Sequence, residues 1–317
     1  MKEFDLIKRY FSDQIIKRKD VLLGIGDDCA ILKGNNFQNI AITTDTLVCG
    51  VHFPETTSPK AIGHKSIAVS LSDLAAMGAE PAWISLAITM PQADETWVKE
   101  FCEGVFELCE YCNVQLIGGD TTQGPLSITV TAQGFTPDKK HITRSGAKPG
   151  DWIYVSRDIG DPGLALMHVQ GKITLKPEYV DKIIYKLDFP KPRILLGQAL
   201  RGYASSAIDV SDGLLADMNH ICAASNVGAN IILDNVPLSD ELKDTLGDKA
   251  IEFAINAGDD YELIFTVSET NKVAMETAVA QTSNKITCIG QINHTHKLTT
   301  TMNEKPVQIN ANGFEHF

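Results

Sequence analysis

Apolar residues recur at helical and strand spacing along the first half of the chain, and this pattern predicts its elements. The helices that it predicts cover residues 4–11, 59–77 and 94–111. The strands that it predicts cover residues 40–46, 83–89, 114–117 and 126–132. Gly78 directly follows the second helix and is expected to end it, because glycine readily takes the left-handed conformation found after helices.

A turn-rich stretch, residues 142–151, interrupts this pattern and precedes a second series of elements. The helices predicted there cover residues 163–168, 193–203, 213–224 and 270–280. The strands cover residues 152–155, 231–233, 261–267 and 287–289. A chain of 317 residues is long enough for about two domains with separate cores. We therefore expect a domain of residues 1–148 and a second, mixed α/β or α+β, of residues 149–317.

Net charge and hydropathy limit the possible partners. The formal charge is −12 and no long cluster of Lys and Arg is present, which argues against nucleic acid as a partner. A phosphorylated small molecule remains possible, because a metal ion held by carboxylates presents positive charge to phosphate. No apolar run has the length of a membrane-spanning helix, and the first residues lack signal-peptide character. We expect a cytoplasmic protein without a membrane partner.

The cysteines are scattered and do not form a metal-binding pattern. Cys109 and Cys112 make one CxxC, but neither a second pair nor a nearby histidine completes a zinc site. Together with Cys102 and the neighbouring valines they fall at helical spacing, so we interpret them as core residues of an amphipathic helix. Reduced cysteines without disulfides are expected.

Aspartates next to Gly, Ser or Thr are the most informative feature. The stretch Gly24-Ile25-Gly26-Asp27-Asp28 places two carboxylates after a flexible turn, and alone it would be interpreted as an Asx-turn or helix cap. Similar acidic positions, which we expect in loops, occur at residues 27–28, 45, 73, 120, 209/212 and 259–260. Several directly follow apolar strands. Six such positions are better explained by convergence on bound cations than by six independent turns.

Two of the polar residues have an alternative structural interpretation. Asp73 lies among apolar and small residues, where a bare carboxylate is costly to bury. It either caps a helix that begins at Ser72 or binds a cation. His52 follows in a loop, and a lone loop histidine is more often a surface hydrogen-bonding residue than a catalyst.

Carboxylates and threonines without nearby histidine or cysteine favour Mg²⁺ over zinc, and Mg²⁺ usually binds together with substrate phosphates. The chain contains no P-loop, no protein-kinase motif set and no complete GxGxxG. These observations predict phosphoryl transfer or ATP hydrolysis that depends on several Mg²⁺ ions. A non-catalytic Mg²⁺ or Ca²⁺ sensor is the alternative of another class, although no EF-hand spacing is present.

Motifs distributed over nearly the whole chain match one family. They are Gly24-Ile25-Gly26-Asp27-Asp28-Cys29-Ala30, Thr44-Asp45-Thr46-Leu47-Val48 with His52-Phe53, Leu71-Ser72-Asp73-Leu74-Ala75-Ala76-Met77-Gly78-Ala79, Leu116-Ile117-Gly118-Gly119-Asp120-Thr121-Thr122, Thr143-Arg144-Ser145-Gly146-Ala147-Lys148-Pro149-Gly150-Asp151, Asp209-Val210-Ser211-Asp212-Gly213-Leu214 and Asp260-Tyr261-Glu262-Leu263. With these motifs the chain resembles the thiamine-monophosphate kinase family. The match departs at Asp259, where the family has Glu, and the C-terminal aromatic is Phe314.

The resemblance implies ATP-dependent phosphorylation of thiamine monophosphate to thiamine diphosphate. It also implies the α+β, two-domain fold of aminoimidazole ribonucleotide synthetase: an N-terminal mixed or antiparallel sheet domain with helices, a C-terminal α/β sandwich domain, and dimerisation through N-terminal strands. An alternative is another ATP-using enzyme of this fold, such as a purine-pathway synthetase or a selenophosphate synthetase.

The same resemblance assigns roles residue by residue. The implied Mg²⁺ ligands are Asp28, Thr43, Thr44, Asp45, Asp73, Asp120, Asp209 and Asp212. The implied ATP contacts are Gly119, Asp120, Arg144 and Ser211. The residues implied to hold thiamine monophosphate are His52, Asp259 and Phe314. Asp45, Asp120 and Arg144 would carry the catalytic step, by direct in-line transfer to a phosphate that is already largely a dianion at neutral pH.

Overall fold

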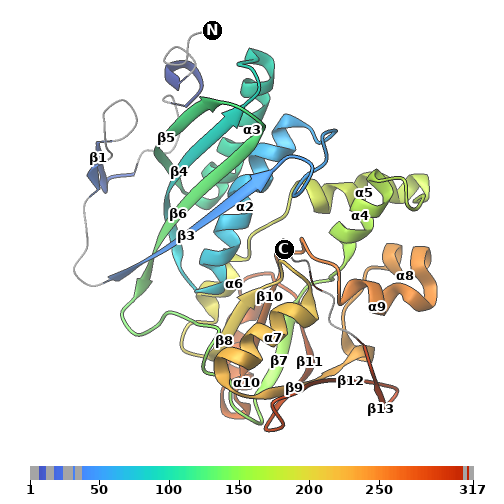
Figure 1. Cartoon of the computed structure of the whole chain (residues 1–317). Coiled ribbons are helices and arrows are strands. Elements are labelled where there is room, and N and C mark those ends of the chain that lie inside the picture. Colours follow the sequence, from blue (N-terminus) through green and yellow to red (C-terminus); the bar gives the residue numbers. More distant parts are fainter. Residues whose placement is uncertain (1–6, 12–17, 24–30, 33–37, 310–312, 314–317) are drawn as a thin grey trace. The chain divides into compact units, whose positions relative to one another are not determined.

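The computed structural model describes residues 7–11, 18–23, 31–32, 38–309 and 313. The chain forms two compact units (Figure 1). The first contains the chain up to Leu74, Ala79–Lys139 and Asp188–Ile194, and the second contains Ala75–Gly78, Lys140–Leu187 and Leu195–Phe317. The change from one unit to the other at Lys139 lies a few residues before the turn-rich stretch in the sequence.

A four-stranded sheet forms the first unit, in the order β3-β6-β4-β5. Its strands are β3 (Gln38–Val48), β4 (Glu80–Met90), β5 (Gln115–Gln123) and β6 (Ser127–Pro137). Only β4 and β5 are parallel, and the helix α3 (Glu95–Cys112) connects them, as parallel strands require. The helix α2 (Pro59–Ala76) connects β3 to β4. The elements η1 (Ile7–Phe11), β1 (Val21–Leu23) and β2 (Ile31–Leu32) precede this sheet.

One face of this sheet packs against the helices, and the other face carries hydroxyls. Leu86 and Val130 lie opposite each other on β4 and β6 and are buried in the same core as Leu71 of α2 and Phe101 of α3. Because side chains alternate along a strand, the residues directly before and after these buried positions point to the other face of the sheet. There, the hydroxyl groups of Thr44 and Thr46 on β3 bond to those of Thr131 and Thr129 on β6, each at 2.9 Å.

Two glycines allow α2 and α3 to approach closely. A Cβ atom at Gly104 would lie 1.9 Å from the carbonyl oxygen of Lys60, and one at Gly63 would lie 2.1 Å from that of Phe101. These oxygens belong to the helix backbones, so neither can move away without shifting a helix.

Gly104→Ala is therefore expected to lower the free energy of unfolding by about 3 kcal/mol, as overpacking of a dense core does. Urea denaturation measures this change. The higher helix propensity of alanine would by itself raise the free energy of unfolding by about 1 kcal/mol, so it acts in the opposite direction to the overpacking. Gly118→Ala is the control, since no atom lies within 4 Å of its added Cβ. Unchanged or increased stability of Gly104→Ala would show that the helices are not in close contact at this point.

A seven-stranded sheet forms the second unit, in the order β13-β12-β9-β11-β7-β10-β8. Its strands are β7 (Trp152–Ser156), β8 (Ala204–Asp209), β9 (Gly228–Ile232), β10 (Leu263–Val267), β11 (Ile286–Asn293), β12 (Leu298–Met302) and β13 (Lys305–Val307). All neighbours are antiparallel except β9 and β12. The helices are α4 (Asp161–Val169), α5 (Pro177–Asp188), α6 (Ile194–Ala199), α7 (Leu214–Ser225), α8 (Asp240–Leu246), α9 (Ala250–Ala254) and α10 (Lys272–Ala280), with short 3-10 turns η2 (Leu233–Asn235), η3 (Gly247–Lys249) and η4 (Glu269–Asn271).

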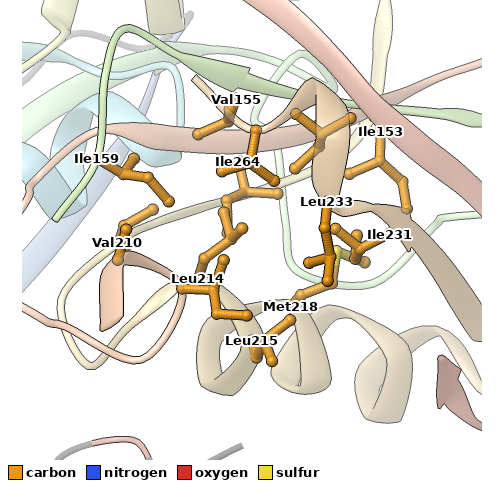
Figure 2. Packing of buried hydrophobic residues seen from close by; sticks show 14 of the residues in the cluster. Ile153, Val155, Ile159, Val210, Leu214, Leu215, Met218, Ile231, Leu233 and Ile264 are labelled. Atoms are coloured by element: carbon orange, nitrogen blue, oxygen red, sulfur yellow. The ribbon is translucent and has the colours of Figure 1, made fainter. Parts of the chain in front are cut away.

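The core of this second unit lies between α7 and the sheet (Figure 2). Leu214 and Met218 of α7 pack with Ile231 of β9, Ile264 of β10 and Val155 of β7. All five side chains are essentially inaccessible to solvent. This packing fixes the first turn of α7, and with it the loop that precedes the helix.

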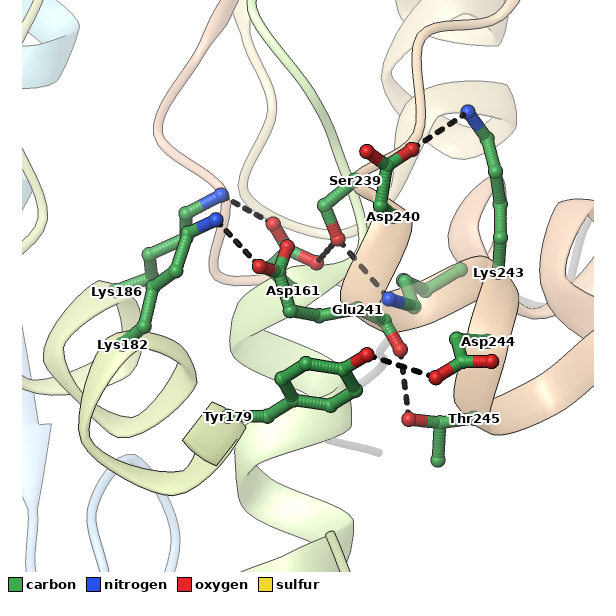
Figure 3. Close-up of polar contacts among 11 residues, drawn as sticks. Asp161, Tyr179, Lys182, Lys186, Ser239, Asp240, Glu241, Lys243, Asp244 and Thr245 are labelled. Carbon is green, nitrogen blue, oxygen red and sulfur yellow. Dashed lines mark hydrogen bonds and ion pairs between the residues drawn. The ribbon is translucent and has the colours of Figure 1, made fainter. Parts of the chain in front are cut away.

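A polar network joins three helices of the second unit around a buried carboxylate (Figure 3). Asp161 at the start of α4 is fully buried and accepts hydrogen bonds from Lys186 of α5 and from the hydroxyl of Ser239. The Ser239 hydroxyl also accepts the backbone N–H of Leu242 at 3.1 Å and so caps α8. The network fixes the start of α4, whose N-cap residue is Gly160.

The predictions for the first unit are largely confirmed. The predicted helices at 59–77 and 94–111 are α2 and α3, and Asp94 caps α3 by accepting the N–H groups of Thr96 and Trp97. Gly78 ends α2 with φ at 64°. Cys102 and Cys109 are buried in the core, as the helical spacing indicated.

Three of the expected acidic loops are regular elements instead. Asp45 lies in the middle of β3, and Asp120 lies within β5, which extends to Gln123 rather than ending at Ile117. Asp73 lies in the last turn of α2, so of its two alternative interpretations the cap of a helix beginning at Ser72 is wrong.

The second unit differs more from its prediction. The helix predicted at 193–203 is the shorter α6, and the strand predicted at 261–267 begins at Leu263. Elements that the pattern did not predict are α5, α8, α9, β8, β12 and β13. Within the described ranges, no helix combines the length and apolar character needed to cross a membrane.

Candidate active site

Two aspartates meet between β3 and α2 in the first unit. The Asp45 carboxylate accepts the hydroxyl of Ser70 at 2.7 Å, and the Asp73 carboxylate accepts the hydroxyl of Thr43 at 2.5 Å. Burial, and then the charge of Asp73, raise the pKa of Asp45 above its usual value. Two half-buried carboxylates this close repel each other unless a cation or a proton lies between them. With the Thr43 hydroxyl they form an oxygen-only donor set that suits Mg²⁺.

The side chains of Thr44 and Asp120 lie on the opposite face of this sheet. Thr44 bonds to Thr131 there, so its side chain does not join that of Asp45. Asp120 lies in one row with Ala87, Thr129 and Thr46 across the four strands, and it is exposed. Thr44 could contact the same ion as Asp45 only through its backbone carbonyl.

Gly119 allows β5 to lie close to β4. It lies in the same row as Asp45, three strand spacings away, or about 14 Å. A Cβ atom at Gly119 would lie 1.8 Å from the carbonyl oxygen of Leu86, and residues with a side chain rarely adopt its φ of 157°. The glycine therefore fulfils a packing requirement here and also leaves its own backbone exposed.

His52 is fixed by its backbone neighbours. Its Nδ1 accepts the backbone N–H of Val48 at 2.9 Å, so in the neutral ring the proton is on Nε2. Its carbonyl oxygen accepts a hydrogen bond from the buried Lys65 at 3.2 Å. The ring is half-buried.

In the second unit, Asp209 is the last residue of β8, and the tight turn that follows carries Ser211 and Asp212. The backbone N–H groups of Ser211, Asp212 and Gly213 all donate to one oxygen of Asp217, Oδ2, at 3.0, 3.1 and 3.2 Å. Burial, and then the charge of Asp212, raise the pKa of Asp217 to about 7. Among the described residues, ligand atoms of Asp212, Asp217 and His220 also lie within 4.8 Å of one another.

The loop that carries Asp259 is bonded to this turn through the backbone. The N–H of Asp259 donates to the carbonyl oxygen of Ser211 at 2.9 Å, and that of Tyr261 donates to Val210 at 2.8 Å. Asp259 and Tyr261 both have left-handed φ angles, 70° and 51°, and the Tyr261 hydroxyl donates to the Asp259 carboxylate at 2.9 Å. This backbone is strained, as often occurs at ligand-binding loops.

The buried carboxylate of Asp260 anchors the strained loop. It accepts the N–H of Gly160 with both oxygens, at 2.8 and 3.0 Å, and burial raises its pKa well above the usual value. Arg144 belongs to the same unit and is exposed. The hydroxyl of Ser225 accepts the N–H groups of Gly146 and Ala147 and donates to the carbonyl of Arg144, which fixes the segment that carries this cation.

The structure thus brings the predicted residues together in two groups. Thr43, Asp45 and Asp73 meet in the first unit. In the second unit, Asp209 ends β8, and Ser211, Asp212 and Asp259 lie on two loops joined by backbone hydrogen bonds. Asp28 and Phe314 lie outside the described residues. The sequence interpretation did not identify Ser70 and Asp217, which support these groups through hydrogen bonds. It counted Asp260 among the acidic positions expected at bound cations, whereas its carboxylate accepts the backbone N–H of Gly160. Only Ser70 had a visible signal, since it lies one helical turn before Asp73.

Comparison with known proteins identifies the family. The model of the AIR synthase related protein N-terminal domain matches residues 26–136, and that of the C-terminal domain matches residues 148–303. The two-domain α+β fold expected from the sequence is confirmed.

Relatives match over the full length. Thiamine-monophosphate kinase of Escherichia coli (strain K12) is 47% identical over 99% of this chain and 98% of its own. The crystal structure of thiamine-monophosphate kinase from Stenotrophomonas maltophilia K279a is 42% identical, covers 97% of this chain and 98% of its own, and superposes with a TM-score of 0.88. A structure described as AaThiL complexed with AMPPCP and TMP is 30% identical over 99% of this chain and 96% of its own, with a TM-score of 0.79. The resemblance found in the motifs is confirmed, and the chain belongs to the thiamine-monophosphate kinase family.

Proposed function

We propose that this chain transfers the terminal phosphoryl group of ATP to thiamine monophosphate, which yields thiamine diphosphate and ADP. The observation that carries the proposal is the pair Asp45 and Asp73 with the hydroxyl of Thr43, an oxygen donor set whose repulsion a metal–phosphate ligand would relieve. The complex of a relative with AMPPCP and TMP, at 30% identity, supports the choice of substrates.

The chain's own side chains would hold the metal ions at several points. In the first unit we assign this role to Asp28, Thr43, Asp45 and Asp73, with Thr44 through its carbonyl and Asp120 from the other sheet face. In the second unit we assign it to Asp209 and Asp212. Bound Mg²⁺ would neutralise the repulsion between two polyanionic substrates and stabilise charge in the transition state.

The remaining residues would bind and orient the two substrates. Gly119 has an exposed backbone, and Ser211 lies on the anchored turn, so both suit nucleotide contacts. Arg144 adds a permanent positive charge near the phosphates. The thiazolium ring of thiamine monophosphate is a cation, which suits the carboxylate of Asp259 and an aromatic face such as Phe314, while His52 can donate from Nε2 to its phosphate.

We propose direct in-line transfer and a homodimer. The acceptor phosphate is largely a dianion at neutral pH, so no side chain has to deprotonate it. The hydroxyl-bearing face of the first-unit sheet also exposes Ile40 and Ile42, at 51% and 65% of their surface, which favours a second copy of the chain on this face.

The test is one incubation of the purified chain with Mg²⁺, γ-³²P-labelled ATP and thiamine monophosphate. We expect labelled thiamine diphosphate and ADP in equal amounts, no turnover with excess chelator, and no label in the acid-precipitated protein. Release of ADP without thiamine diphosphate would overturn the proposed function. Label retained on the protein would overturn direct transfer but not the overall reaction.

A further inference from the structure

Asp217 occupies an unusual position for a helix residue. It lies in the first turn of α7, is 2% exposed, and points back so that one of its oxygens, Oδ2, accepts three consecutive backbone N–H groups. Three N–H groups that converge in this way form a cradle that in many proteins binds an external anion. Here the chain fills that cradle with its own carboxylate. The turn held in this way, Ser211–Gly213, includes Ser211, the proposed nucleotide contact, and Asp212, a proposed metal ligand.

The turn held by Asp217 in turn supports the neighbouring loop. The carbonyl oxygen of Ser211 accepts the N–H of Asp259, and the two loops approach so closely that a Cβ atom at Gly258 would lie 2.3 Å from that oxygen. A shift of the turn would therefore be transmitted to Asp259. The Ser211–Gly213 turn is fixed at its other end by the packing of α7 in the core. The Asp259 loop is fixed at its other end by the hydrogen bond from the N–H of Gly160 to Asp260.

A structural helix cap would not need this arrangement. Asp240 in the first turn of α8 is 98% exposed in its side chain and forms an ion pair with Lys243, at 3.7 Å. Asp217 is also an acidic first-turn residue, yet it is buried and its contacts reach beyond the helix to the turn that precedes it. Removing a carboxylate from water costs free energy, and the three hydrogen bonds to Asp217 offset that cost at a buried position that would otherwise favour an apolar residue.

We propose that Asp217 is a positioning residue for phosphoryl transfer, which holds the Ser211–Gly213 turn, and through it the Asp259 loop, in the geometry that binds the nucleotide and its metal ion. This inference rests on the proposed function, but its first readout is nucleotide binding, which does not require the acceptor substrate.

The experiment compares Asp217→Ala, Asp217→Asn and the matched control Asp240→Asn. A fluorescent ATP analogue with Mg²⁺ gives the Kd, and steady-state assays with thiamine monophosphate give kcat and KM. Asp217→Ala is expected to raise the Kd and lower kcat by roughly 10- to 100-fold each, as loss of a supporting contact behind a metal ligand does. Asp217→Asn can place its amide oxygen where Oδ2 lies, so it is expected to remain within about threefold of the wild type. Asp240→Asn is expected to match the wild type.

The outcomes separate positioning from stability. If Asp217→Ala only melts at a lower temperature and keeps the wild-type Kd and kcat per folded molecule, the proposal is wrong. It is also wrong if Asp217→Asn is impaired as much as Asp217→Ala, because the charge would then matter more than the acceptor oxygen. Should the alanine variant not fold, Asp217→Gln replaces it, since an acceptor displaced by one methylene should weaken binding. A wild type that binds nucleotide without converting thiamine monophosphate would overturn the proposed function alone.

Discussion

Asp45→Asn is expected to stabilise the metal-free protein and to lower kcat by about 10³-fold, which corresponds to about 4 kcal/mol of lost transition-state stabilisation. The stability gain follows from the sign of the pKa shift. Burial and Asp73 raise the pKa of Asp45 in the folded state. Its ionised form therefore destabilises the folded state above that pKa, a cost that disappears as the pH falls through the folded pKa toward the unfolded value. Asparagine removes the charge and can still accept the Ser70 hydroxyl.

Thermal melts with and without Mg²⁺ and ATP test this prediction. The wild-type midpoint should rise when both ligands are present, because a ligand that binds only the folded state stabilises it. The Asp45→Asn midpoint should start higher and rise less. Asp138→Asn is the control, since Asp138 is an exposed carboxylate of the same unit and has no proposed ligand role. A variant that is less stable without ligands and retains near-normal kcat would remove Asp45 from the metal site.

For the proposed ligand residues of the first unit, the sequence predicted the chemistry better than the secondary structure in which they lie. Thr43–Thr46 and Gly118–Thr122 were expected at strand ends because glycine, threonine and aspartate are typical of turns. Both segments lie inside strands, since β6 pairs with every residue of β3 and β4 pairs with β5 as far as Gln123. Threonine is also a good strand residue, and a strand ends where its neighbour ends. That information lies in another part of the chain.

The second unit illustrates a different limit. Only two residues of α5, Ile183 and Leu187, are buried, so its apolar pattern is short. The first four residues of β8, Ala204–Ala207, are small, so the strand is stabilised by its pairing with β10 rather than by its own composition. Long elements with a wide apolar stripe, such as α3, could be predicted locally.

The supporting roles of residues that hydrogen-bond to the backbone of the candidate site were not predictable from the sequence either. Asp217 had no local signal, and Asp260 was expected at a bound cation rather than as the acceptor of the Gly160 N–H, which lies 100 residues away in the sequence. The local sequence does not distinguish a buried carboxylate from an exposed one. The motifs therefore identify the family and the ligand residues, whereas the fold shows how those ligands are held.

Asp120→Asn is expected to lower kcat by about 10³-fold as well, but to leave the stability of the protein unchanged. Asp120 is exposed on the edge strand β5, and its row across the sheet contains Ala87 and threonines rather than a second carboxylate. An exposed side chain without such a neighbour contributes within about 0.5 kcal/mol to folding. A large loss of activity would then report lost contact with the nucleotide or its metal ion, and it should be accompanied by a higher KM for ATP.

The comparison of Asp120→Asn with Asp45→Asn is more informative than either variant alone. Both should be nearly inactive, yet only Asp45→Asn should change the melting temperature of the metal-free protein, because only Asp45 is buried beside another carboxylate. Glu103→Gln, at an exposed position of α3, is the control for removing a surface charge from the same unit. Near-normal kcat and KM in Asp120→Asn would exclude Asp120 as a ligand. A lowered melting temperature with normal kinetics would instead assign Asp120 a structural role in β5. The hydroxyl-bearing face of the sheet would then lose its proposed contact with the nucleotide.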